Sequence, residues 1–248
     1  MKAPATSTLN PPSALPDAAI VNFELPNASG SSRAAKRALD IALSLVVLFC
    51  AIPLFLAVGA WMLVTSPGPI LFKQERIGRH GRRFLCFKFR TMKVGASITG
   101  HQQHLQHLIQ SNTPMTKMDA KGDKRLIPGA WLLRASGLDE LPQILNVIRG
   151  EMSLVGPRPC LPYEWEQFQP WQRARSEALP GLTGLWQVSG KNKTTFEQMI
   201  RLDIRYARQN DIWLDLAIML RTLPALINQV IETRKARNTP QIRNAAAA

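Results

Sequence analysis

The chain contains few cysteines, few acidic residues and no evident internal repeat. Its 248 residues include only Cys50, Cys86 and Cys160, whose spacing matches neither a metal-binding motif nor a disulfide framework. A reduced compartment is therefore expected. The chain has 17 acidic residues against 31 lysines and arginines, a formal net charge of +14 at pH 7, so its partners should be anionic. Nucleotide sugars, lipid phosphates, anionic bilayers and nucleic acids all qualify.

The N-terminal segment carries no sustained apolar periodicity. Residues 1–32 are rich in Ala, Pro, Ser and Asn, a composition typical of a disordered arm. They do not predict a secretory signal, because the apolar run that follows begins too late and lacks a cleavage region.

One long apolar run extends from Ile41 to Val64. It covers about 24 residues, enough for a helix to cross a bilayer. Basic residues flank both ends of the run: Arg33, Lys36 and Arg37 before it, and Lys73, Arg76, Arg79, Arg82 and Arg83 after it. Such residues favour the cytoplasmic face, and Pro53 near the middle removes a helical hydrogen bond. Two topologies satisfy these facts: a re-entrant membrane helix over residues 33–66 with a break at Pro53, and a kinked spanning helix. The residues alone do not favour one over the other.

Two further segments have readable patterns. Ile70 to Met92 alternates apolar and basic residues around glycine turns, which predicts a strand hairpin. Ile212 to Ile231 is apolar but interrupted by charged residues and Pro224, which predicts a pair of interfacial amphipathic helices and not a second span. Between them, the polar segment 94–125 contains His101, His104 and His107; histidines in such a segment are more often exposed than zinc ligands.

The motif with the clearest chemistry is Asp139-Glu140-Leu141-Pro142-Gln143, followed by Gly156-Pro157-Arg158-Pro159. Pro142 suits the first turn of a helix and Gly150 the position after its end, so the acid pair should lie at a helix N-terminus. Adjacent carboxylates can share Mg²⁺ while one keeps an oxygen free to attack phosphorus. Arg158, between two prolines, could neutralise phosphate. Taken alone, an adjacent acid pair is more often a solvated helix end.

Several blocks occur together with this motif. They are Phe72-Lys73-Gln74-Glu75-Arg76-Ile77-Gly78, Lys88-Phe89-Arg90-Thr91-Met92, the run from Leu132 to Gln143, Asn146-Val147, the run from Gly150 to Pro159, and Pro180-Gly181-Leu182-Thr183-Gly184-Leu185-Trp186-Gln187. In this order they resemble the signature of the bacterial sugar transferases, the monotopic polyprenyl-phosphate phosphoglycosyl transferases. The resemblance covers most of residues 33–230.

The resemblance implies a helix-rich α+β fold. A re-entrant membrane helix would precede a catalytic domain over residues 67–231, with a small strand hairpin and interfacial amphipathic helices. Residues 232–248 would form a basic, then alanine-rich, tail. The protein would lie on the cytoplasmic face of the bacterial inner membrane, against anionic lipid.

The resemblance also implies an activity. Such an enzyme transfers a sugar-1-phosphate from a uridine-diphosphate (UDP) sugar to undecaprenyl phosphate and releases uridine monophosphate (UMP), the first membrane step of exopolysaccharide synthesis. Asp139 would attack phosphorus, and Glu140 would hold Mg²⁺ together with Asp139. The expected phosphate-binding residues are Lys88, Arg90, Arg134, Arg158, Pro157 and Pro159.

Other interpretations stay open at the level of sequence. A membrane-associated glycosyl transferase would release UDP instead of UMP. A basic membrane-tethered scaffold or nucleic-acid-binding protein would suit the charge, but the chain lacks a basic-aromatic readout module, so we expect no nucleic-acid partner. A hexose donor is preferred because the region Trp186 to Gly190 resembles members that use galactose or glucose. A homodimer is compatible with the sequence.

Overall fold

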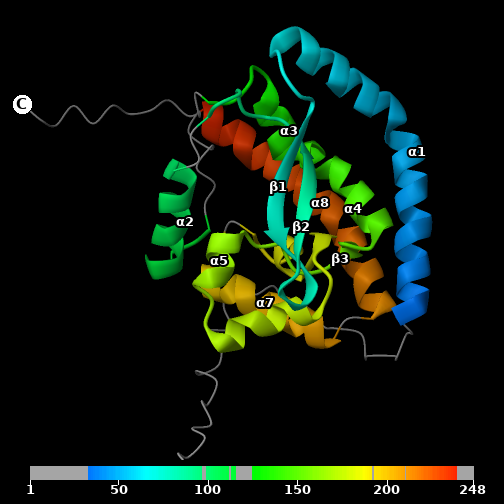
Figure 1. The fold of residues 1–248 in the computed structure, drawn as a ribbon, viewed down its shortest axis with the longest axis vertical. Helices are drawn as coiled ribbons and strands as arrows, with labels where there is room; N and C mark the ends of the chain where they lie inside the picture. The colour runs from blue at the N-terminus through cyan, green and yellow to red at the C-terminus, as the bar shows by residue number, and fades with distance from the viewer. Residues whose placement is uncertain are drawn as a thin grey trace, which may run out of the picture.

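The computed structural model describes residues 33–96, 99–111, 113–115, 125–191, 193–209 and 211–238. Over these residues the chain forms a helix-rich α+β structure with two small sheets (Figure 1). The expected helix-rich α+β fold class, with its strand hairpin, is therefore confirmed. The expected disordered arm, residues 1–32, lies outside the described residues.

Helix α1 (Arg33–Thr65) contains Pro53 and is continuous, so the expected break of the helix at Pro53 is wrong. Figure 1 shows it rising along one side of the molecule and then bending over one end. Bends of this kind in long helices usually have a proline as their cause. Large apolar side chains along the middle of α1 are exposed: Leu45, Val46, Phe49, Ile52 and Leu56.

Both ends of α1 pack against the rest of the chain. Near its start, Asp40 is buried and accepts hydrogen bonds from Ser153 Oγ at 2.8 Å and from the Leu154 N–H at 3.1 Å. Near its end, Val58 and Met62 are buried in a cluster with Phe89 and Leu133. The two bonds of Asp40 tie the start of α1 to residues 153 and 154.

Strands β1 (Leu71–Ile77) and β2 (Arg83–Phe89) form the expected antiparallel hairpin. Lys73 lies opposite Phe87, and Ile77 lies opposite Arg83. The short turn η1 (Arg79–Gly81) connects the strands, and Gly81 there has φ 76°, a left-handed conformation that glycine adopts without strain.

The segment that carries the acid pair consists of α3 (Ala130–Ser136), η3 (Leu138–Gln143) and α4 (Ile144–Arg149). The pair lies in the first turn of η3, a 3₁₀ helix, and regular α-helix begins after Gln143. Gly150 ends α4 with φ 83°, as the sequence predicted. Strand β3 (Ser153–Val155) then pairs in parallel with β4 (Gly181–Thr183).

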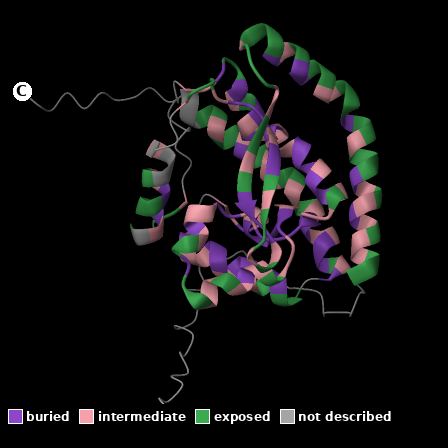
Figure 2. Ribbon diagram, viewed as in Figure 1, coloured by how far each residue is buried: buried purple, intermediate pink, exposed green. Residues whose placement is uncertain are grey.

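The remaining helices surround the main core (Figure 2). They are α2 (Thr99–Ser111), α5 (Pro162–Glu166), η4 (Pro170–Glu177), α6 (Leu185–Val188), α7 (Phe196–Gln209) and α8 (Ile212–Asn238). Buried core side chains include Val147, Met152, Met199, Tyr206 and Ile218. Aromatic residues of α5, η4 and the link between them contribute to this core. Phe168, in the link, is buried, and Trp165 and Trp171 pack against the core.

The prediction of a helix pair over residues 212–231 is wrong. Helix α8 is one helix, with Pro224 inside it, and it continues into the basic tail as far as Asn238. Contacts with α3, α6 and both strands of the β3–β4 sheet hold α8 along its length, so one missing hydrogen bond at proline does not end it. Among the described helices, α1 and residues Ile212–Lys235 are long and apolar enough to cross a membrane.

Candidate active site

The acid pair follows a sharp backbone turn at Gly137, which has φ 75°. Asp139 is largely buried, whereas the Glu140 side chain is 41% exposed. The two neighbouring carboxylates therefore differ in environment. The buried Asp139 is held by its surroundings, and Glu140 can reach ligands from solvent.

Lys88, on strand β2, contacts the acid pair directly. Its Nζ lies 2.7 Å from Glu140 Oε1, and strand β2 packs along η3. The structure thus brings together Lys88, Asp139 and Glu140, three residues that the sequence predicted for one site. Because the Lys88 side chain is only 20% exposed, this ion pair is less screened than an ordinary surface pair.

Arg158 is held by a carboxylate that the sequence analysis missed. Both of its terminal nitrogens donate to Glu164, with the shortest bond at 3.1 Å, and Glu164 is fully buried. Burial opposes the charge on Arg158, but Glu164 outweighs it and raises the pKa of Arg158. Burial likewise acts to raise the pKa of Glu164, and the two arginines Arg158 and Arg76 lower it overall.

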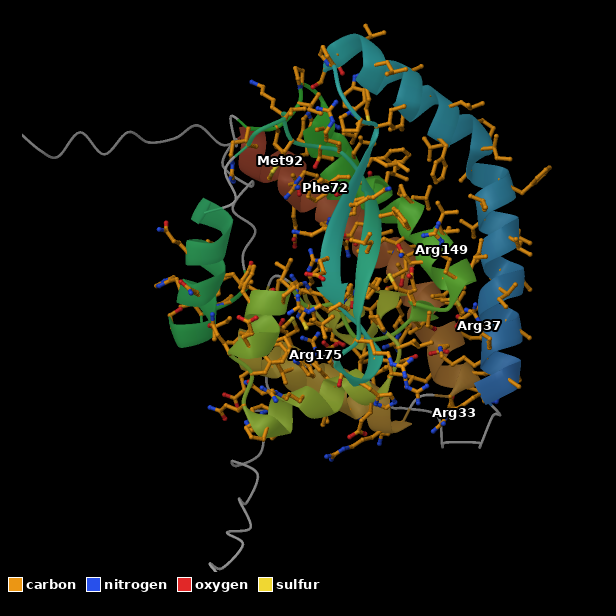
Figure 3. The ribbon with its side chains drawn as sticks, viewed as in Figure 1. Arg33, Arg37, Phe72, Met92, Arg149 and Arg175 are labelled. Carbon is orange, nitrogen blue, oxygen red and sulfur yellow. The ribbon has the colours of Figure 1, made fainter. Side chains whose placement is uncertain are left out.

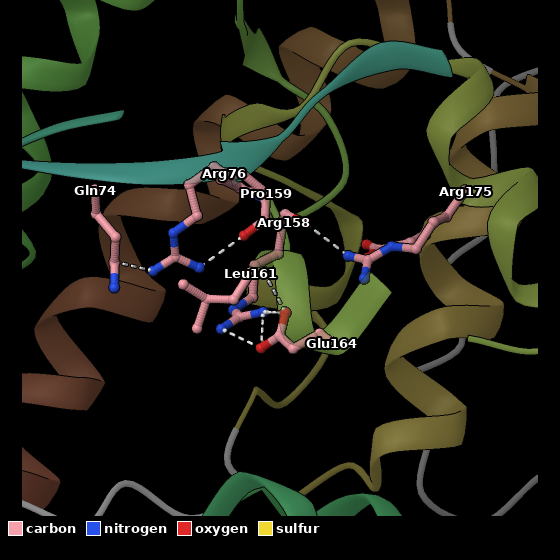
Figure 4. A network of polar contacts seen from close by, with 8 residues as sticks. Gln74, Arg76, Arg158, Pro159, Leu161, Glu164 and Arg175 are labelled. Atoms are coloured by element: carbon pink, nitrogen blue, oxygen red, sulfur yellow. Dashed lines mark hydrogen bonds and ion pairs between the residues drawn. The ribbon is translucent and has the colours of Figure 1, made fainter. Parts of the chain in front are cut away.

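Arg76, on strand β1, completes this group (Figure 4). It donates to the carbonyl of Pro159 at 2.9 Å and to Gln74 Oε1 at 2.7 Å. Burial, together with the nearby Arg158, lowers the pKa of Arg76. Glu140 acts to raise the pKa of both arginines, with a smaller effect than Glu164.

The backbone of the Pro157–Arg158–Pro159 turn is fixed by glycine contacts. A Cβ atom on Gly156 would lie 2.2 Å from the carbonyl oxygen of Leu179, and one on Gly181 would lie 2.0 Å from the nitrogen of Gly156. Such distances leave room for glycine alone. The N–H of Gly181 also donates to the Pro157 carbonyl at 2.9 Å. The glycines of the Pro180–Gly184 turn therefore serve close backbone packing, which orients Arg158.

The other predicted phosphate-binding arginines have protein partners. Arg134, on α3, donates to Thr91 Oγ1 at 3.3 Å. The guanidinium of Arg90 is buried and donates to the carbonyls of Ser66 and Pro69 at 2.7 Å each. Arg90 thus ties the end of α1 to the start of the hairpin. Phosphate binding by either arginine stays a prediction.

Sequence reasoning missed several buried charges for a physical reason. Arg76 looked like one of many basic residues, although the two-residue alternation along β1 places it with Gln74 on one face. Glu164 and the buried pair Arg175–Asp203 carry no local signal. Only the tertiary fold shows that an isolated glutamate or aspartate is buried against an arginine.

The donor set fits Mg²⁺ in one respect. Magnesium sites commonly use one or two carboxylates and take their remaining oxygens from water and substrate phosphates, and Asp139 with Glu140 supplies such a pair. No group of three or more His, Cys, Asp or Glu residues within the described ranges could hold a metal by itself. Within the described ranges, the histidines of α2 therefore form no metal-binding group. The side chain of His101 is not part of those ranges.

Three known proteins with similar sequences are named for exopolysaccharide production or for sugar transfer with undecaprenyl phosphate. ExoY, an exopolysaccharide production protein of Sinorhizobium fredii, is 35% identical over 213 residues, which cover 82% of this chain and 92% of ExoY. The undecaprenyl-phosphate galactose phosphotransferase of Salmonella typhimurium is 36% identical over 82% of this chain, which spans only 42% of that protein. The UDP-glucose:undecaprenyl-phosphate glucose-1-phosphate transferase of Caulobacter vibrioides is 38% identical over 77% of this chain and 69% of its own length.

The family model described as bacterial sugar transferase matches residues 31–229. The matched range contains α1, the hairpin, the acid pair and the Arg158 turn. The chain belongs to the bacterial sugar transferase family.

Proposed function

We propose that this protein transfers a hexose-1-phosphate from a UDP-hexose to undecaprenyl phosphate and releases UMP, as the initiating membrane step of exopolysaccharide synthesis. The observation that carries the proposal is the contact of Lys88 with Glu140 beside Asp139. It places a cation beside two carboxylates, where it can stabilise the charge that develops on a transferred phosphoryl group. The names of two relatives support the substrate class. One is a galactose phosphotransferase and the other a glucose-1-phosphate transferase, and both names include undecaprenyl phosphate.

In the proposed mechanism Asp139 attacks the phosphorus atom that is bonded to the sugar. The bond from this phosphorus to the bridging oxygen breaks, UMP leaves with the electron pair, and the sugar phosphate stays on Asp139 as an acyl phosphate. An oxygen of the lipid phosphate then attacks the same phosphorus and frees Asp139. Lys88, which contacts Glu140, and Arg158 would stabilise the charge of the diphosphate.

Asp139 and Glu140 would hold Mg²⁺ in this proposal. Bound with the donor's phosphates, the metal would neutralise charge on the leaving UMP. The protein's own contribution is the fixed position of the two carboxylates: η3 begins at a glycine turn and is continued by α4, whose end is also held. There, Arg37 (Figure 3) donates to the carbonyls of Val147 and Ile148 at 2.6 Å and 2.8 Å.

The contacts of α1 support a re-entrant anchor. Its first turns bind β3 and α4, and its last turns pack on the hairpin and α3. A straight helix of this length would extend about 50 Å, and a spanning helix would carry its two ends to opposite faces of the bilayer. Both ends instead contact the same catalytic domain, while the middle exposes apolar side chains. We propose that this middle part enters the membrane from the cytoplasmic face and returns.

Helix α8 offers a second apolar surface. Leu220, Leu223, Ile227 and Ile231 are exposed and recur at helical spacing, while Leu214 and Ile218 are buried in the core. A helix with one face in the core and the other apolar and exposed suits the membrane interface. The acceptor's polyprenyl tail stays in the bilayer, so a catalytic domain held at headgroup depth meets its phosphate without extracting the lipid.

One assay tests the proposal. Purified protein with Mg²⁺, undecaprenyl phosphate and either UDP-galactose or UDP-glucose should release UMP and form a lipid-linked sugar diphosphate. Release of UDP with a lipid-linked sugar monophosphate would support the glycosyl transferase instead. Absence of turnover with any UDP-sugar, together with salt-dependent binding of nucleic acid, would contradict both.

A further inference from the structure

The side-chain amide of Asn146 joins α4 to the open edge of strand β2. Asn146 is fully buried; its Oδ1 accepts a hydrogen bond from the Phe87 N–H at 3.1 Å, and its Nδ2 donates to the Leu85 carbonyl at 2.7 Å. The hairpin has only two strands, so this edge would otherwise present unpaired backbone groups. The amide supplies the donor and the acceptor that a third strand would supply.

These two hydrogen bonds prevent β2 from sliding along its own axis relative to α4. They engage the residues on either side of Cys86, as the N–H and C=O of one residue in a neighbouring parallel strand would do. A shift of β2 by one residue would break both bonds and turn every side chain of the strand to the opposite face. The amide therefore specifies the register of β2 against α4.

The orientation of the amide is itself determined. Nδ2 also donates to Glu151 Oε2 at 2.6 Å. An ionised carboxylate only accepts and the backbone N–H of Phe87 only donates, so the NH₂ group must face Glu151 and the oxygen must face Phe87. The backbone carbonyl of Asn146 accepts the N–H of Glu151 at 3.0 Å, which keeps that carboxylate close by.

Lys88 follows Phe87 directly, and α4 follows η3 directly. The segment η3–α4 is thus bridged to β2 twice: by Asn146 and by the 2.7 Å contact of Lys88 with Glu140. We propose that Asn146 is a positioning residue that sets the register of β2 so that Lys88 meets Glu140 beside Asp139. This inference rests on the proposed function, in which Lys88 serves the reaction.

The test replaces Asn146 by an isosteric acid. Asn146→Asp removes both N–H donors and places an oxygen against the Leu85 carbonyl and Glu151. Hydrogen exchange of the backbone amides in residues 83–89, followed by mass spectrometry, should become at least about tenfold faster. The rate of UMP release should fall about 10–100-fold in the wild-type background, but less than about threefold in a Lys88→Met background, because residues that act through one another are not additive.

A matched control separates positioning from general loss of stability. Asp211→Ala removes the 2.8 Å hydrogen bond from the Leu214 N–H that starts α8, which destabilises the fold without contacting β2. It should lower the thermal midpoint and leave exchange in residues 83–89 unchanged. If Asn146→Asp does not fold, Glu151→Ala removes the carboxylate that orients the amide and should give the same pattern in milder form.

Different results would contradict the positioning role of Asn146 and the proposed function of the protein. Unchanged exchange in residues 83–89, or an equal fall in UMP release with and without Lys88, would overturn the positioning role. Faster exchange in a protein that releases no UMP even as wild type would support the register role and contradict the proposed function.

Discussion

Lys36 and Asp215 form an ion pair that joins α1 to α8. The hydroxyl of Tyr206, in α7, donates to the same carboxylate at 2.6 Å. Burial raises the pKa of Asp215, and Lys36 limits that rise. The start of α1 is therefore tied to α7 and α8 by a charge pair that is mostly shielded from water.

Lys36→Met should destabilise the protein by about 3 kcal/mol, because it leaves a buried carboxylate without its cation. The double variant Lys36→Met/Asp215→Asn should recover part of this loss, since it removes the uncompensated charge as well. Urea unfolding in detergent measures both effects. An equal or larger loss in the double variant would show that packing of the lysine stem, and not the charge pair, holds α1 in place.

The re-entrant topology predicts that both ends of α1 face the cytoplasm. In a background without Cys50, Cys86 and Cys160, single cysteines at Ala34 and Thr65, which are both exposed, should resist a membrane-impermeant thiol reagent in intact cells. Both should react after the cells are opened. Labelling of one position alone in intact cells would establish a spanning helix.

Lys88→Met should lower UMP release by about 10–100-fold while changing the free energy of unfolding by less than about 1 kcal/mol. The small structural effect follows from Glu140, which is 41% exposed and can be solvated when its partner is lost. Lys73→Met is the matched control, because it removes an exposed lysine from the neighbouring strand with the same change in net charge. Equal effects of the two variants would indicate a general influence of charge and not a contact at the site.

Residue patterns within a short stretch of sequence predicted the elements that depend on that stretch alone. The alternation of residues 70–92 gave the hairpin, and Gly150 gave the end of α4. The acid pair and Lys88, distant in sequence, were both expected at the site, and the fold places them in contact. Proline was a weaker guide: Pro224 suggested two helices, but packing against several neighbours keeps α8 continuous.

The partners of buried charges could not be predicted. Nothing near Glu164 in the sequence marks it as the carboxylate that binds Arg158, because its burial depends on the packing of β1 against α5. Asn146 is similar, since the strand that it bonds lies about 60 residues away in the chain. Whether a polar group is buried depends on the whole fold. A buried polar group is stable only when its hydrogen-bonding partners are present.

The buried pair of Arg175 and Asp203 predicts a pH effect on stability. Burial, opposed by Arg175, raises the pKa of Asp203 to about 6 from 3.8. A raised folded-state pKa means that the contribution of Asp203 to stability is fully present below pH 3.8 and is lost as the pH rises through about 6. Asp203→Asn should therefore gain up to about 3 kcal/mol relative to wild type between pH 4 and pH 7.

Thermal midpoints of wild type and Asp203→Asn across this pH range measure the effect. Other groups, such as Glu164, titrate in both proteins and cancel in the difference. Arg175 keeps its 2.7 Å hydrogen bond to the Arg158 carbonyl in the variant, so the site should remain folded. A difference between the two midpoints that stays constant with pH would contradict the raised pKa of Asp203.

The covalent mechanism makes the last prediction. In the proposed mechanism Asp139 attacks before the lipid does, so protein with Mg²⁺ and donor but no acceptor should release up to one equivalent of UMP and retain the sugar phosphate. Mass spectrometry of the digested protein should find the added mass on the peptide that contains Asp139, and undecaprenyl phosphate should discharge it. Asp139→Asn keeps the shape of the side chain but removes the attacking anion, so it should abolish the adduct and lower turnover by several orders of magnitude. Donor binding without an adduct, together with initial rates of the ternary-complex type, would mean that the lipid phosphate attacks the donor directly.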